Sequence, residues 1–185
     1  MKREYPILIG GRRIKTGSAL DVINPYTGDA AGVTYLAGTI ELEEAVGRSV
    51  EAFETLKGYT TCKRAEIIEG VARGITERGE ELARIIALEA GKPIKDSRAE
   101  VKRAINTFHL ASEEAKRLGG EIISLDIIEG SEKRFGIVRR FPVGPVLAIT
   151  PFNFPLNLVA HKVAPSMACG NPVIVKPASK TPLTA

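Results

Sequence analysis

The chain has 185 residues, of which 44% are hydrophobic and 26% are charged, a composition typical of soluble globular proteins. Its formal net charge of +4 arises from 26 basic and 22 acidic residues, an excess too small to indicate a nucleic-acid-binding protein. No segment approaches the ~18 apolar residues of a membrane span, and the apolar run near the N-terminus is too short for a signal peptide, so we expect a cytoplasmic protein.

The first 38 residues are typical of short strands joined by tight turns. Gly10 and Gly11 lie between two apolar arms, which predicts a hairpin. In the following NPYTG segment, Pro25 fixes φ and Gly28 allows a positive φ, which predicts a second turn. We therefore expect two or three short strands at the start of the chain.

From residue 39 to 118 the apolar residues recur with helical spacing, which predicts a cluster of amphipathic helices. Thr39 is expected to be the N-cap of the first helix. Gly74 and Gly79 indicate a break between two helices, and Gly91 indicates a helix C-terminus.

Residues 121–141 return to a period of two, with a turn near Gly130 and Ser131, which predicts a long hairpin. The hairpin is too extended to bury both faces alone, so it is a candidate arm for contact between subunits. Its basic cluster, residues 132–140, indicates a strand with charges on its solvated face, as edge strands often have, and not a nucleic-acid site.

The last 44 residues predict a strand, a helix and a strand at the length of one parallel crossover. The two apolar runs, 143–149 and 171–176, are typical of strands buried on both faces, and residues 156–170 of a helix. Thr181 and Pro182 then indicate the start of another helix. Because two parallel strands leave unpaired edges, we expect the N-terminal part of a longer α/β protein.

Two polar residues follow these strands, at the edge where open α/β sheets bind ligands. Asn153 lies between Pro151 and Pro155, and its amide is suited to stabilise an oxyanion as it forms. Lys176 ends the second strand and would project into the same crevice. Two plainer interpretations stay open: Asn153 as the N-cap of the next helix, and Lys176 as a strand-end lysine reaching solvent.

Residues 141–185 closely resemble the cofactor-binding core of the aldehyde dehydrogenase superfamily. The most specific part is PFNFP followed by GNPVIVKP, and the likeness extends to the opening strands, to the helical stretch around GKP and to the hairpin. The resemblance implies an α/β fold with a helical cluster, a parallel Rossmann-like sheet and an extended oligomerisation hairpin. It divides the chain into 1–120, the N-terminal strands and helical part; 121–141, the hairpin arm; and 142–185, the first strand–helix–strand of the cofactor-binding sheet.

The resemblance also implies a chemistry in which a cysteine attacks an aldehyde, hydride passes to NAD or NADP, and a glutamate-activated water hydrolyses the thioester. Asn153 matches the residue that holds the oxyanion, Lys176 the lysine that binds the adenosine ribose, and Lys162 a lysine near the proton path. The matches along the cofactor wall are Ile149, Thr150, Pro151 and Phe152. The matches along the substrate tunnel are Phe154, Leu158 and His161.

The nucleophilic cysteine and the glutamate lie further along the chain in that family, so this chain alone is expected to be inactive. Cys62 and Cys169 are expected to be structural, the second as a buried side chain. With His109 and His161 as the only histidines, no metal site is expected.

Ser179 stands where many NAD-preferring relatives carry a glutamate that would repel a 2′-phosphate, which favours NADP or the use of both coenzymes. Asn157 resembles the pattern of relatives that act on small hydroxylated or phosphorylated aldehydes, such as lactaldehyde, glyceraldehyde 3-phosphate or a semialdehyde. We expect a homodimer or homotetramer through residues 121–141. The alternative is a non-catalytic module that binds a cofactor or a partner chain.

Overall fold

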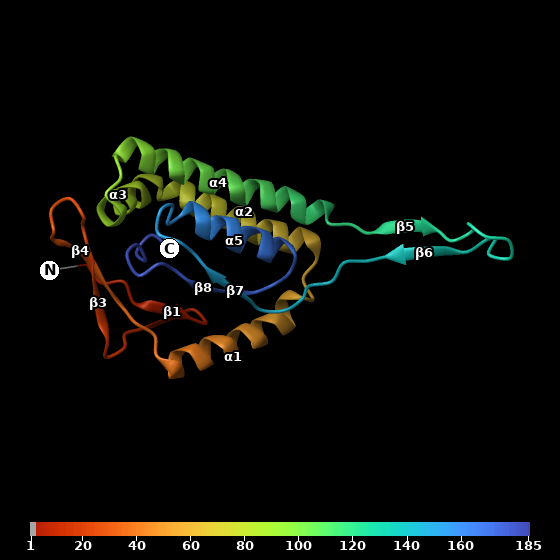
Figure 1. The fold of residues 1–185 in the computed structure, drawn as a ribbon, viewed down its shortest axis with the longest axis horizontal. Helices are drawn as coiled ribbons and strands as arrows, with labels where there is room; N and C mark the ends of the chain where they lie inside the picture. Colours follow the sequence, from red (N-terminus) through yellow and green to blue (C-terminus); the bar gives the residue numbers. More distant parts are fainter. Residues whose placement is uncertain (1–2) are drawn as a thin grey trace.

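Four short strands precede the helices in the computed structural model, which describes residues 3–185 (Figure 1). They form two antiparallel pairs: β1 (Ile7–Ile9) with β2 (Arg12–Ile14), and β3 (Ala19–Ile23) with β4 (Ala30–Tyr35). Gly10, Gly11 and Gly28 have positive φ angles of 54°, 79° and 77°, so both predicted turns are confirmed.

Five helices follow in the described chain: α1 (Thr39–Leu56), α2 (Thr61–Glu77), α3 (Gly79–Ala90), α4 (Ile94–Arg117) and α5 (Asn157–Ala168). The prediction of Thr39 as the first N-cap is wrong by one residue. Gly38 is the cap, because its extended backbone presents an N–H to the Glu41 carboxylate at 2.7 Å. The predicted break falls at Gly79, whereas Gly74 lies inside α2.

The hydrophobic core lies where α2, α3, α4 and α5 meet, because each helix turns its apolar stripe to the others. Ile68 of α2 and Ile86 of α3 are fully buried, and Phe108 of α4 packs with them. At the C-terminal end of α5, the Nε–H of Arg64 on α2 donates a hydrogen bond to the Ala168 carbonyl at 3.1 Å. The core thereby fixes α5, which leads into the candidate site.

Strands β7 (Val146–Ile149) and β8 (Val173–Lys176) are parallel, with α5 as the connection between them, as predicted. The expectation that β7 is buried on both faces is wrong. Ala148 is buried, but Leu147 and Ile149 on the opposite face are 57% and 59% exposed. The reason is the alternation of side chains along a strand: within residues 3–185 only one face of β7 is covered.

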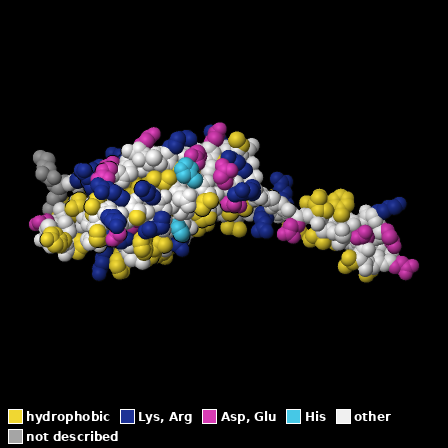
Figure 2. Space-filling model, turned by 90° about the horizontal axis from the view of Figure 1, so that it is seen from above, with side chains coloured by type: hydrophobic (Ala, Val, Ile, Leu, Met, Phe, Trp, Pro, Cys, Tyr) yellow, Lys and Arg dark blue, Asp and Glu magenta, His cyan; other side chains and the backbone are white. Residues whose placement is uncertain are grey.

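The predicted hairpin is confirmed as β5 (Glu121–Ser124) paired with β6 (Phe135–Val138), and it projects from the helical body as an arm (Figure 1). Gly130 has a φ of 86° in the connecting turn. Yellow side chains on the arm in Figure 2 show that its apolar residues face solvent. Within residues 3–185, no helix is long and apolar enough to cross a membrane.

Candidate functional site at the ends of the parallel strands

The carboxyl ends of β7 and β8 lie side by side and carry the two residues singled out in the sequence. Ile149 pairs with Lys176, and the Thr150 N–H donates to the Lys176 carbonyl at 3.2 Å. Lys176 is exposed, and its Nζ donates to the Pro177 carbonyl at 3.1 Å. The strand before Asn153 and the strand that ends at Lys176 therefore finish at the same edge.

Asn153 is exposed, and its carboxamide has no hydrogen-bond partner among residues 3–185. The alternative interpretation of Asn153 as a helix N-cap is wrong. The N-cap of α5 is Leu156, with no side-chain cap of its own, because a bend at residues 152–154 and a turn at 155–156 separate Asn153 from the first helical residue, Asn157. The amide of Asn153 is thus free to meet a ligand.

The loop that carries Asn153 is tied to the loop after β8. The Thr181 hydroxyl donates to the Phe152 carbonyl at 3.3 Å, and the Lys180 ammonium lies 5.7 Å from the centre of the Phe152 ring. Thr181 is buried in this contact, and residues 181–185 form no helix. The wall residues Ile149, Pro151 and Phe152 are exposed, Thr150 is buried, and Ser179 is exposed next to Lys180.

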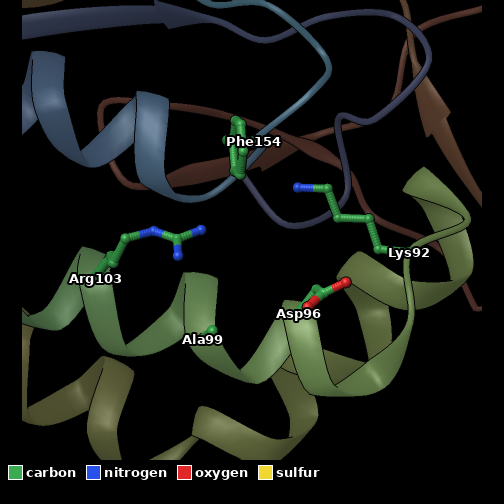
Figure 3. Close-up of a pocket in the computed structure, with 5 residues that line it drawn as sticks. All are labelled: Lys92, Asp96, Ala99, Arg103 and Phe154. Carbon is green, nitrogen blue, oxygen red and sulfur yellow. The ribbon is translucent and has the colours of Figure 1, made fainter.

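A hollow of about 330 Å³ lies directly beside this loop (Figure 3). The Phe154 ring lies above α4. The Lys92 ammonium is 3.9 Å from the centre of the ring, and the Arg103 guanidinium carbon is 5.4 Å from it. Asp96 and Ala99 of α4 form the floor between the two cations. Lys92 also pairs with the buried Glu100 carboxylate at 2.6 Å, so Arg103 is the cation of the hollow that remains for an anionic group.

The predicted tunnel residues lie on one helical face. Phe154, Leu158 and His161 have the spacing of successive turns, and the Leu158 N–H donates to the Phe154 carbonyl at 3.0 Å. His161 and Lys162 are exposed, and Leu158 is half-buried. Of these residues, Phe154 alone lines the hollow.

Asn157, in the first turn of α5, is only 8% exposed. Its Oδ1 is buried without a hydrogen-bond partner in the described chain. Because buried acceptors are nearly always paired, this oxygen is an exception within residues 3–185.

Two buried glutamates were not found from the sequence. Glu100 of α4 is 0% exposed, and its Oε1 accepts from the N–H groups of Leu156 at 3.0 Å and Asn157 at 3.2 Å. Glu89 of α3 accepts from the Leu183 N–H at 2.7 Å, and burial raises its pKa above the usual value. A charged residue on an apolar helix face was the one signal that could have indicated them.

Both cysteines are exposed, so the expected burial of Cys169 is wrong. It is the C-cap of α5, where the chain leaves the helix and the side chain reaches water. Within residues 3–185, no three His, Cys, Asp or Glu side chains gather in a way that could hold a metal ion.

Comparison with known proteins gives consistent matches. The model of the "Aldehyde dehydrogenase family" matches residues 13–185. A 3-sulfolactaldehyde dehydrogenase of Priestia megaterium is 38% identical over 99% of this chain and 38% of its own length. The solved aldehyde dehydrogenase 21 of Physcomitrella patens, in complex with the reaction product succinate, has a TM-score of 0.94 at 41% identity and covers all of this chain and 38% of its own.

A third match is the solved glyceraldehyde-3-phosphate dehydrogenase GapN of Methanocaldococcus jannaschii, complexed with NADP. It has a TM-score of 0.83 at 44% identity, over 89% of this chain and 35% of its own. The chain thus spans less than two fifths of the length of each of these relatives.

Proposed function

Because the chain belongs to the aldehyde dehydrogenase family, we propose that it contributes, within a complete enzyme, to the oxidation of an aldehyde to a carboxylic acid. The observation that carries this proposal is the unpartnered, exposed carboxamide of Asn153 beyond a parallel strand and beside a ligand-sized hollow. The Asn153 NH₂ donates to the aldehyde oxygen as a cysteine thiolate from elsewhere in the complete enzyme adds to the carbonyl carbon. Such a donor favours the oxyanion over the neutral carbonyl, which lowers the barrier.

The open edge beside Asn153 fits a dinucleotide, because Ile149, Phe152 and Lys176 are exposed at the ends of neighbouring parallel strands. When bound, NAD or NADP would supply the two-electron acceptor of the oxidation. Lys176 would hold the adenosine ribose. Ser179 places no negative charge near a 2′-phosphate and Lys180 adds a positive one, which supports NADP or the use of both coenzymes.

The substrate is proposed to be a small aldehyde with a hydroxyl and an anionic group. Arg103, whose guanidinium carbon lies 5.4 Å from the centre of the Phe154 ring in the hollow, would attract a carboxylate, sulfonate or phosphate, whereas Lys92 is paired with Glu100. The hydroxyl is proposed from the resemblance of the segment around Asn157 to relatives that act on small hydroxylated aldehydes, since the Asn157 side chain itself is buried. The relatives point the same way, since their names specify sulfolactaldehyde, succinate and glyceraldehyde 3-phosphate.

Three further assignments are proposed with this function. Lys162 lies one turn beyond Leu158 on α5 and would assist proton movement, with His161 at the tunnel wall. The exposed apolar side chains of the 121–141 arm support its use in a homodimer or homotetramer. The division into 1–120, 121–141 and 142–185 and the cytoplasmic location stay predictions.

The test is the substitution Asn153→Ala in the complete enzyme, assayed on a panel of anionic and neutral aldehydes with NAD and NADP in parallel. We expect kcat to fall by about 10²–10³-fold, because one oxyanion donor is lost. The control is Asn171→Ala, which alters an asparagine that accepts from the Val143 and Gly144 N–H groups and is expected to change stability more than kcat. Unchanged turnover in Asn153→Ala, or coenzyme binding without aldehyde oxidation by the wild type, would overturn the proposal in favour of a binding module.

A further inference from the structure

The loop from Thr150 to Leu156 is held at both ends and free in its middle. Thr150 is tied to β8, Phe152 to Thr181, and the side chain of Pro155 is fully buried. Asn153 is the member whose own side chain has no partner among the described residues. Its carboxamide is therefore placed by what fixes the backbone on either side of it.

At its C-terminal end, where α5 begins, the loop is held by one carboxylate on another helix. The first N–H groups of a helix have no partner inside it, and α5 has no side-chain cap from its own sequence. Glu100 supplies the acceptor from α4, with Oε1 within 3.2 Å of two of these N–H groups. The negative charge also suits the positive end of the helix dipole.

Lys92 completes this arrangement. Its Nζ lies 2.6 Å from Oε2 of Glu100, so the fully buried carboxylate is both neutralised and hydrogen-bonded on each oxygen. The same ammonium lies over the Phe154 ring, next in sequence to Asn153. The pair thus contacts the chain directly after the residue proposed to hold the oxyanion, at Phe154 and at the start of α5.

We propose that Glu100 is a positioning residue for Asn153, which sets the direction of its carboxamide through the start of α5. This inference rests on the oxyanion role proposed above for Asn153. Leu156 is three residues from Asn153 with only Phe154 and the buried Pro155 between them, so a shift of the α5 N-terminus is transmitted to the amide. Displacement of a reacting group by about 1 Å can lower the rate by about 100-fold.

Glu89 provides a matched control. It is also a buried carboxylate on a neighbouring helix, at 3% exposed, and it also accepts backbone N–H groups, from Leu183 and Thr184. The loop that it holds follows β8 and does not contain Asn153. Glu89→Gln therefore perturbs a comparable buried carboxylate without touching the cap of α5.

The experiment is a double-mutant cycle in the complete enzyme between Asn153→Ala and Glu100→Gln. We expect Glu100→Gln to lower kcat by about 10-fold or more, with the KM for coenzyme changed by less than about twofold. In the Asn153→Ala background the same substitution is expected to have less than about a twofold effect on kcat, because its target is gone. Glu89→Gln is expected to show a smaller difference between the two backgrounds than Glu100→Gln, because it reaches the Asn153 loop only through the Thr181–Phe152 hydrogen bond.

Equal losses from Glu100→Gln in both backgrounds would overturn the positioning role while leaving the oxyanion role intact. A kcat unchanged by Asn153→Ala would overturn both. If Glu100→Gln does not fold, the cycle uses a double variant in its place, Lys92→Met with Glu100→Gln. This variant leaves no unpaired buried charge. Hydrogen exchange at the Leu156 and Asn157 amides gives an independent reading, since faster exchange in the variant is required and unchanged exchange contradicts the proposal.

Discussion

The Lys92–Glu100 pair predicts a large effect on stability when the lysine loses its charge. Lys92→Met keeps an unbranched apolar side chain but leaves the Glu100 carboxylate, at 0% exposure, without its counter-charge. Breaking a buried pair costs about 3–5 kcal/mol, and we take about 3 kcal/mol because Lys92 is 20% exposed and Glu100 keeps two N–H donors. Loss of the contact with the Phe154 ring adds about 0.5–1 kcal/mol.

We therefore expect the free energy of unfolding to fall by about 3.5–4 kcal/mol in Lys92→Met. The measurement is urea unfolding of the complete enzyme at a fixed protein concentration, followed by circular dichroism, with the slope m compared between variants. The control is Lys95→Met, an exposed lysine one turn away, for which a change within about 0.5 kcal/mol is expected. A loss below about 1 kcal/mol in Lys92→Met would refute the reasoning, because it would mean that water or another cation compensates Glu100.

Three other predictions follow from the fold. Gly91→Ala is expected to lower the free energy of unfolding by about 2–4 kcal/mol, whereas Gly28→Ala is expected to lower it by about 1 kcal/mol. Both glycines have positive φ, but only at Gly91 would the new Cβ lie 2.6 Å from the Pro25 ring. Equal losses of stability in the two variants would contradict this reasoning. Ile137→Asp on the arm is expected to lower the oligomeric state in light scattering, and an unchanged mass would argue against the arm as an interface. Hydrogen bonds from Arg98 lower the pKa of Glu80 to about 2, so its stabilisation is present above pH 4.5 and lost as the pH falls towards 2. The Tm difference between wild type and Glu80→Gln should shrink over that range, and a constant difference would contradict it.

The features that the sequence predicted correctly depend on neighbours along the chain. Gly10 and Gly28 turn the chain because only local backbone geometry decides their φ angles, and Gly91 ends α3 for the same reason. The strand–helix–strand of residues 143–176 follows from apolar patterns and the strong preference for a parallel crossover. The common edge at which β7 and β8 end follows from that topology.

The features that were missed depend on residues far apart in sequence. Glu100 reaches Leu156 across 56 positions, and Glu89 reaches Leu183 across 94, so no local pattern indicates that either carboxylate caps a loop. The incomplete burial of β7 and the exposure of Cys169 are also tertiary outcomes, since hydrophobicity shows what can be buried but not which element covers it. Buried glutamates on apolar helix faces are therefore worth testing as anchors in related sequences.

The arm formed by β5 and β6 has a thermodynamic consequence. A two-stranded ribbon with water on both faces has little folding free energy of its own. Its backbone hydrogen bonds compete with hydrogen bonds to water, and its isoleucine side chains stay exposed to solvent. In the homo-oligomer proposed above, the surface of a second subunit would cover those isoleucines, so that folding of the ribbon and association of subunits would become one equilibrium. Protease susceptibility between Glu121 and Val138 would accordingly decrease as the protein concentration rises, in the way that a ligand protects its binding site.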